Sequence, residues 1–469
     1  MHCLAKVVRN SVIESCGPYW ALMVDESKDV SRKEQLSFVI RSTTPDGSVW
    51  EKPLGAFHMT KVDAESLASA INDAVLKNKL LWNKCVAQCY DGASIMSGRL
   101  AGVQANIKAI APQVIYIHCH AHRLNLVLVY TIKSIPEIAT LFFLIQSIYV
   151  FLTVSGPRHE LFVQAQKDDN LPVLELERLV ETRWSYWYRS ICKIKLRVTT
   201  IVDVLDTLSM QQSDRDAAAE AQGLRNRICS ITFIRCLLVV EKLLGCVNAL
   251  SEELQSRTID YLSAVACIER TRNDLISFRT DVFWNSIAEE ADTIGGKIGV
   301  LSNCDISRSQ RRQTVTKKLS DYYVLSTTGK TEINSAENNQ ATMKTSVLFA
   351  CIDRFVCELD ARFTVNDGVL KGVAVFSPTS TDFLSPERVQ DLVKLYPTSD
   401  IDWVVLDSQL RSAKSFIESQ EAPVSTIHDV RSHLNRLPTG FSEAIKVIDL
   451  ILTLPVTSVE NERFSSCMK

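Results

Sequence analysis

Three carboxylates in separate parts of the sequence have the residue types and positions of a divalent-metal site. Asp25 directly follows the apolar run at 20–24, and Asp91 directly follows a second apolar run at 82–90. Glu462 lies in the segment Ser-Val-Glu-Asn-Glu-Arg-Phe-Ser, near the other end. Carboxylate oxygens suit Mg²⁺ or Mn²⁺, and two such cations about 3.5–4 Å apart support in-line attack on a phosphodiester. The pattern therefore predicts metal-dependent phosphodiester chemistry.

Each carboxylate also has an ordinary structural interpretation. An Asp that follows a strand is often a turn residue or a helix N-cap, and for Asp25 or Asp91 taken singly that interpretation is favoured. Glu26 and Asp29 lie beside Asp25, and their turn-like context favours solvated or capping roles over metal binding. Only the three acidic residues taken together favour the metal site.

Four separated segments carry a resemblance to a known family. They are Met-Val-Asp-Glu-Ser-Lys-Asp-Val-Ser (23–31), Cys-Tyr-Asp-Gly-Ala-Ser-Ile-Met-Ser-Gly (89–98), His-Cys-His-Ala-His-Arg-Leu-Asn-Leu-Val-Leu (118–128) and Leu-Thr-Leu-Pro-Val-Thr-Ser-Val-Glu-Asn-Glu-Arg-Phe-Ser (452–465). In this order they resemble the hAT-superfamily transposases, in particular the transposase-derived, zinc-finger-MYM-like group. Thr182-Arg183-Trp184 and the segment 359–363 also fit that group.

The resemblance implies a fold and a set of site residues. The fold is α/β, an RNase H-like mixed-sheet core interrupted by a large all-helical insertion. The site is a DDE-type triad, in which Asp25 and Asp91 match the two Asp residues and Glu462 matches the Glu; Glu460 is a weaker match. The last segment resembles the start of a hAT C-terminal dimerisation segment. The implied cofactor of an active protein is Mg²⁺ or Mn²⁺, and the implied partners are a second copy of the chain and DNA.

The hydrophobic pattern favours the same architecture. Strands are expected at 20–24, 35–42, 49–59, 82–90 and 114–118, and helices at 63–77, 97–109 and 119–154 with a break at Pro136. From residue 190 to about 400 the apolar spacing is helical. The expected domains are a core from 1–189, a helical insertion at 190–425 with a flexible loop at 303–344, and a truncated C-terminal segment at 426–469 that completes the core.

Several further residues are candidates for nucleic-acid contact. Cys119 and His122 have one-turn helical spacing, but a structural zinc site needs four ligands, so we expect no zinc. The resemblance implies a Cys-x-x-His motif near the active site, and with it a structural or DNA-positioning role for this pair. Trp184 has two equal interpretations, stacking on an unpaired base and burial beside Trp187. The predicted polar loop carries a group of cationic side chains that either bind DNA phosphates or are simply solvated. They are Arg308, Arg311, Arg312, Lys317 and Lys318.

Composition limits the cellular setting and the mode of binding. The formal net charge is −2, so any nucleic-acid contact must come from local patches, since DNA-binding domains are usually basic. The 14 Cys form no repeating framework and no signal peptide opens the chain, which favours a nuclear, otherwise cytoplasmic, protein over a secreted one. The apolar stretch at 138–154 is short for a membrane span, and we expect a helix buried against a sheet.

Two classes of function compete at this stage. The sequence shows no zinc-finger spacing of the BED type, and it ends seven residues after Glu462. These departures favour a transposase-derived protein that acts through dimerisation and DNA binding with little or no turnover, its dimer weakened by the short end. The alternative is an active DDE-type transposase core that cleaves and transfers DNA strands with two divalent metals. A general RNase H-like nuclease is a weaker third option.

Overall fold

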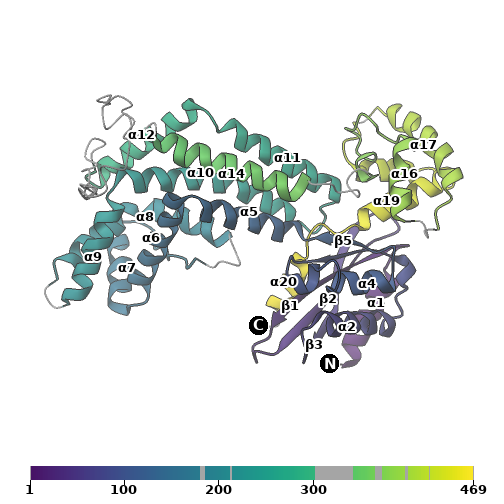
Figure 1. Cartoon of the computed structure of the whole chain (residues 1–469), viewed down its shortest axis with the longest axis horizontal. Coiled ribbons are helices and arrows are strands. Elements are labelled where there is room, and N and C mark those ends of the chain that lie inside the picture. Colours follow the sequence, from purple (N-terminus) through teal and green to yellow (C-terminus); the bar gives the residue numbers. More distant parts are fainter. Residues whose placement is uncertain are drawn as a thin grey trace, which may run out of the picture. The chain divides into compact units, whose positions relative to one another are not determined.

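The chain forms two compact units, each assembled from separated segments of the sequence. The structure is a computed structural model that describes residues 2–179, 185–211, 214–300, 342–364, 372–396, 400–421 and 423–467. The first unit, called the sheet unit here, comprises Met1–Val127, Ala249–Thr271 and Leu359–Lys469. The second, called the helical unit, comprises Leu128–Asn248 and Arg272–Glu358. Figure 1 shows the elements of both units.

A five-stranded mixed sheet in the order β3-β2-β1-β4-β5 forms the centre of the sheet unit. The strands are β1 (Trp20–Lys28), β2 (Glu34–Thr43), β3 (Val49–His58), β4 (Cys85–Tyr90) and β5 (Ile115–His118). Strand β2 is antiparallel to both β1 and β3, whereas β4 runs parallel to both β1 and β5. The mixed α/β fold class and the five strands predicted from the hydrophobic pattern are therefore confirmed.

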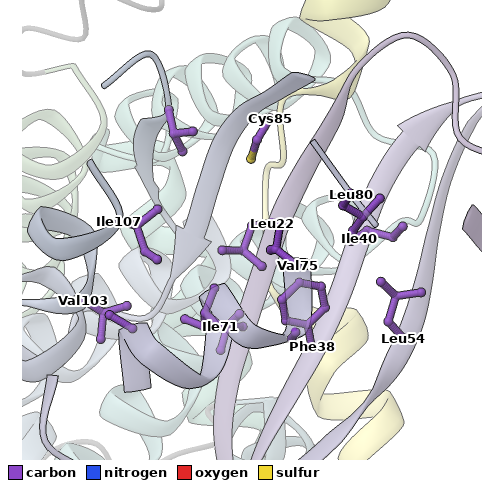
Figure 2. Close-up of a cluster of buried hydrophobic side chains, with 14 of the residues drawn as sticks. Leu22, Phe38, Ile40, Leu54, Ile71, Val75, Leu80, Cys85, Val103 and Ile107 are labelled. Carbon is purple, nitrogen blue, oxygen red and sulfur yellow. The ribbon is translucent and has the colours of Figure 1, made fainter. Parts of the chain in front are cut away.

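One face of this sheet is closed by helices α1 (His2–Glu14), α2 (Ala64–Lys77) and α4 (Val103–Ile110). Successive strand residues point to opposite faces, so Leu22 and Phe38 reach this side of the sheet. There they pack against Ile71 of α2 and Ile107 of α4 in a fully buried cluster (Figure 2). Met23, the neighbour of Leu22, faces the opposite side with a smaller group of buried residues.

The later segments of the sheet unit are mostly helical. They contain the end of α10 (Ile231–Leu254), the start of α11 (Tyr261–Ser277), η4 (Asp360–Thr364), α16 (Pro386–Leu395), α17 (Trp403–Glu418), α18 (Ile427–Leu434), α19 (Ser442–Thr453) and α20 (Val459–Ser466). Side-chain hydrogen bonds fasten these segments to the strands. The Tyr396 hydroxyl donates to the Val86 carbonyl at 3.1 Å. The guanidinium of Arg41 donates to the carbonyls of Leu452 and Ile259 at 3.2 and 2.6 Å.

The described part of the helical unit contains helices and irregular connections but no strand. The helices are the end of α5 (His120–Ser134), α6 (Pro136–Thr153), α7 (Gly156–Asp168), α8 (Ser185–Ser209), α9 (Arg215–Ile228), most of α10, the end of α11, α12 (Asp281–Lys297), η3 (Lys344–Phe349) and α14 (Ala350–Leu359). Among the described residues, α6 is the one helix long and apolar enough to cross a membrane. Eight of its residues, including Leu144 and Ile148, are buried inside the protein.

Two expectations from the sequence need correction here. The predicted burial of 138–154 against a sheet is wrong, because α6 packs against helices α7, α8 and α9. The unit boundaries also differ from the predicted 1–189, 190–425 and 426–469: the first segment of the sheet unit ends at Val127, and residues 249–271 and 359–425 return to it. Helical periodicity locates a helix but does not say what the helix packs against. Most of the predicted loop at 303–344 lies outside the described residues.

Candidate active site

The two Asp residues of the predicted triad lie on the neighbouring parallel strands β1 and β4, Asp25 within β1 and Asp91 directly after β4. The β1–β4 register places Met23 opposite Cys89, and Asp25 and Asp91 each come two residues later. Asp25 lies within β1, where its carbonyl accepts a hydrogen bond from the Ser37 hydroxyl of β2 at 2.9 Å. Asp91 immediately follows β4. The prediction that these residues lie on neighbouring strands is confirmed.

The carboxyl group of Asp25 lies in an unfavourable environment for a negative charge. Burial raises its pKa well above the usual range, and the carboxylates of Glu462 and Asp91 raise that pKa further. Glu462 and Asp91 are therefore each close enough to Asp25 to act on its charge, although the three residues come from distant parts of the sequence. Such mutual repulsion favours either a bound proton or a bound cation.

Glu462 reaches this place because helix α20 is fastened to the sheet. The Ser27 hydroxyl of β1 donates to the Ser465 hydroxyl at 3.0 Å, and Ser465 lies one helical turn from Glu462. Just before the helix, the Ser458 amide donates to the Cys119 sulfur at 3.3 Å. The His120 amide donates to the Val456 carbonyl at 3.0 Å. The prediction that this segment returns to the strand-bearing core is confirmed.

The neighbouring Glu460 has a different role from Glu462. Its two carboxylate oxygens accept hydrogen bonds from Nε and Nη2 of Arg257, each at 2.9 Å. Arg463 adds a further contact at 3.1 Å. Residues two apart on a helix point in directions about 200° apart, so Glu460 and Glu462 cannot face the same partner. Glu460 is a buried ion-pair residue, whereas the Glu462 side chain is exposed, which favours Glu462 as the third acidic residue.

A turn built around Gly92 fixes the direction of Asp91. The Ala93 amide donates to the Asp91 carboxylate at 3.1 Å, and the Tyr116 hydroxyl donates to the Asp91 carbonyl at 3.1 Å. The imidazole of His118 packs against Gly92, and its Nε2 is buried without a hydrogen-bond partner. Burial and the charge of Arg123 lower the pKa of His118 to about 3, so this ring is neutral at physiological pH.

Sequence reasoning did not assign a role to Gly92, Tyr116 or His118. A signal was available, because the residue after Asp91 is a glycine and His118 ends the strand expected beside it. A glycine directly after a candidate acidic residue indicates a close approach of another group to the backbone. The identity of that group follows only from the β4–β5 register, which pairs Tyr90 with His118.

Cys119 and His122 differ in their surroundings. Cys119 is buried, and the thiol of Cys89 lowers its pKa to about 7 against the opposing effect of burial. His122 is half-buried, with its ring centroid 5.4 Å from that of His118. Because the Cys119 sulfur already accepts from Ser458, it has a structural role at the start of α5. Whether either residue contacts DNA stays a prediction.

The acidic residues suit an open cation site better than a closed one. Among the described residues, no group of three His, Cys, Asp or Glu side chains is arranged to hold a metal ion. Mg²⁺ typically takes one or two protein carboxylates and completes its shell with water and substrate phosphates. Asp25 within β1 and Asp91 just after the adjacent strand β4 fit that pattern, with Glu462 as a further ligand on a separate helix.

The remaining predicted nucleic-acid contacts lie outside the described residues. These are Trp184, Arg311, Arg312, Lys317 and Lys318. Their roles stay predictions from the sequence.

Comparison with known proteins agrees with this geometry. Residues 1–102, which include Asp25 and Asp91, match the family described as "ZMYM1/FAM200, RNase-like domain". The chain is also similar to the human "52 kDa repressor of the inhibitor of the protein kinase", with 20% identity over 297 residues. That alignment covers 60% of this chain and 38% of the human protein. The two likenesses support a relationship to hAT-related, transposase-derived proteins and an RNase-like fold for the sheet unit.

Proposed function

We propose that the sheet unit is a transposase-derived core that binds Mg²⁺ or Mn²⁺ through Asp25, Asp91 and Glu462 and cleaves DNA phosphodiester bonds. One observation carries this proposal: the buried carboxyl of Asp25 lies close enough to Glu462 and Asp91 for both to raise its pKa. The negative charges of Glu462 and Asp91 disfavour the ionised form of Asp25 unless a cation or a proton intervenes. Divalent cations bound there would activate the attacking oxygen and stabilise the leaving oxygen.

The described residues supply the positioning that such chemistry needs. Asp25 is fixed within a central strand, and Asp91 is held by the turn at Gly92 and by the Tyr116 hydroxyl. Glu462 lies on a helix attached to β1 and to Cys119. Rigid placement of the reacting groups provides much of the rate in reactions of this kind.

A second candidate is binding without turnover, as a dimeric DNA-binding protein in the nucleus. It is favoured by the exposed side chain of Glu462 and by the lack of a preassembled three-ligand group among the described residues. The human relative is named as a repressor, which also agrees with a binding role. In this case the acidic residues would be retained for stability of the fold or for weak cation binding.

Nicking of supercoiled DNA distinguishes the two candidates. We expect the protein to nick the plasmid in Mn²⁺ but not in EDTA, and Asp91→Asn to abolish nicking. Asp73→Asn is the matched control, because Asp73 is exposed on α2 and its loss should leave nicking unchanged. No nicking by the wild type, together with a DNA mobility shift at low salt, would favour the second candidate. Nicking that survives Asp91→Asn would contradict the proposed site.

A further inference from the structure

The connection between α10 and α11 lies directly against the helix that carries Glu462. Arg257 in this connection makes a two-point contact with Glu460 of α20, and Arg463 of α20 donates to the Gln255 carbonyl at 2.7 Å. Two residues later, the Ile259 carbonyl accepts from Arg41 of β2 at 2.6 Å. The connection is therefore attached both to α20 and to the sheet.

The burial of the two partners shows which one depends on the contact. The side chain of Glu460 is 9% exposed, whereas that of Arg257 is 63% exposed. A carboxylate that is largely removed from water needs its cationic partner, and a two-point guanidinium contact also fixes its direction. Arg257 thus supplies the two-point contact that ties Glu460 to the α10–α11 connection, whereas the further donor, Arg463, lies on α20 itself and cannot fix the rotation of that helix through this bond.

Helix α20 depends on such contacts for its own orientation. It has eight residues, and Ser458 at its N-cap makes no side-chain capping hydrogen bond. An isolated helix of this length is not stable in water, so tertiary contacts determine how it is rotated about its axis. Any rotation of α20 that moves Glu460 also moves Glu462, two residues further along the same helix.

We propose that Arg257 is a positioning residue for Glu462: by holding Glu460, it fixes the rotation of α20 and so the distance of Glu462 from Asp25. The inference rests on the proposed function, since it assumes that Glu462 shares a cation with Asp25. Both α10 and α11 continue into the helical unit. Arg257 itself lies in the segment Ala249–Thr271 of the sheet unit, so the proposed positioning contact is internal to that unit.

Mn²⁺ binding, measured by calorimetry on the full chain without DNA, tests this role. We expect Arg257→Gln to weaken Mn²⁺ binding about tenfold, within the 10- to 100-fold range typical of residues that orient metal ligands. The same change in a Glu462→Gln background should have no further effect, because the ligand that Arg257 positions is already lost. Arg270→Gln is the matched control, because it breaks an ion pair with Glu253 that does not include α20.

The outcomes separate this inference from the proposed function. Mn²⁺ binding that Asp25→Asn does not weaken would overturn both. Two outcomes would overturn the positioning role alone, provided that Mn²⁺ binding depends on Asp25. One is an affinity that Arg257→Gln leaves unchanged. The other is an equal loss of affinity from Arg257→Gln in the wild-type and Glu462→Gln backgrounds. If thermal unfolding shows that Arg257→Gln does not fold, the same pair of Mn²⁺ titrations, with and without Glu462→Gln, uses Arg257→Lys. Lys keeps the charge but loses the two-point contact, and wild-type affinity in that variant would overturn the inference.

Discussion

The imidazole of His118 packs so closely on Gly92 that a Cβ there would lie 2.6 Å from its Cε1 and 2.7 Å from its Nε2. The turn after Asp91 therefore has room for glycine alone while His118 keeps its place. Because the Asp91 carboxylate accepts from the Ala93 amide in the same turn, the packing of His118 and the direction of Asp91 depend on each other.

Gly92→Ala should destabilise the fold and weaken the acidic site. We expect the free energy of unfolding to fall by about 1–3 kcal/mol, the usual cost of an extra methyl group in a tightly packed place. Urea denaturation measures this change, and Mn²⁺ titration measures the site. Gly296→Ala is the control, because a Cβ there meets nothing within 4 Å and its cost should be negligible. Equal effects of the two substitutions would contradict the close packing at His118.

Arg41→Met should be among the most destabilising single substitutions in the sheet unit. Arg41 and Glu51 form an ion pair at 2.7 Å with side-chain exposures of 0% and 6%. Removing the cation leaves Glu51 buried and unpaired and two carbonyls without a donor, so we expect a loss of about 3–5 kcal/mol. Chemical denaturation measures it.

Arg279→Met is the corresponding control for that substitution. The Arg279–Asp353 ion pair has the same 2.7 Å separation, but its side chains are 45% and 56% exposed. Exposed pairs contribute about 0–1 kcal/mol, because water screens the attraction. A similar loss for both variants would show that burial of the Arg41 pair does not determine its contribution.

The pH dependence of stability should change in Asp25→Asn. The folded-state pKa of Asp25 is raised above its ordinary value of 3.8, so between these values the folded state binds more protons than the unfolded state. Stability from this group is therefore lost as pH rises through that window. We expect Asp25→Asn to unfold at a higher temperature than wild type at pH 8 in EDTA, with the difference vanishing below pH 3.8.

Added Mn²⁺ should reverse this order at pH 8. A ligand that binds only the folded state stabilises it, so wild type should gain thermal stability and Asp25→Asn should not. A variant less stable than wild type in EDTA would show that the Asp25 carboxylate is not repelled by its neighbours.

The purified protein should contain no stoichiometric zinc bound by Cys119. The Cys119 sulfur accepts a hydrogen bond from the Ser458 amide, and the described residues offer no group of three ligands to a metal. Elemental analysis measures this directly. One zinc per chain, lost on Cys119→Ala, would disprove the structural role given to this thiol.

The same Cys119→Ala substitution should lower stability. It leaves the buried Ser458 amide without an acceptor, at a cost of about 1–3 kcal/mol. Cys357→Ala is a suitable control, because that thiol is exposed. Unchanged stability in Cys119→Ala would indicate that the Ser458 amide finds another partner.

Strands were easier to predict than the packing of helices. Each strand is a short apolar run bounded by recognisable turn residues. One example is the turn at Gly47, whose φ of +86° suits glycine. The helix expected over 97–109 is instead two helices, α3 (Ser94–Ser97) and α4. Gly98 and Gly102 approach each other between them, since a Cβ on Gly102 would lie 2.5 Å from the Gly98 amide nitrogen. Hydrophobic spacing does not reveal such a contact.

The acidic residues could be named from the sequence, but their surroundings could not. Asp91 directly follows β4 as the apolar run predicts, whereas β1 continues past the expected end at residue 24 to Lys28, so Asp25 lies within the strand. The contact that orients α20 depends on Arg257, a single arginine in the connection between α10 and α11. No local sequence pattern indicates this role. Arg257 and Glu460 are 203 residues apart, and tertiary packing determines their contact. Hydrophobic periodicity along the sequence does not reveal such a contact.

Assembly of the sheet unit from three chain segments has a consequence during synthesis on the ribosome. Arg41 and its acceptor Leu452 are separated by 411 residues, so at about 5–20 residues per second roughly 20–80 s pass between their translation. During that interval the nascent β2 strand carries a guanidinium whose later partners do not yet exist. The sheet unit cannot complete these contacts until residue 452 has been synthesised, and we expect a chaperone that shields nascent strands to raise the yield of folded protein.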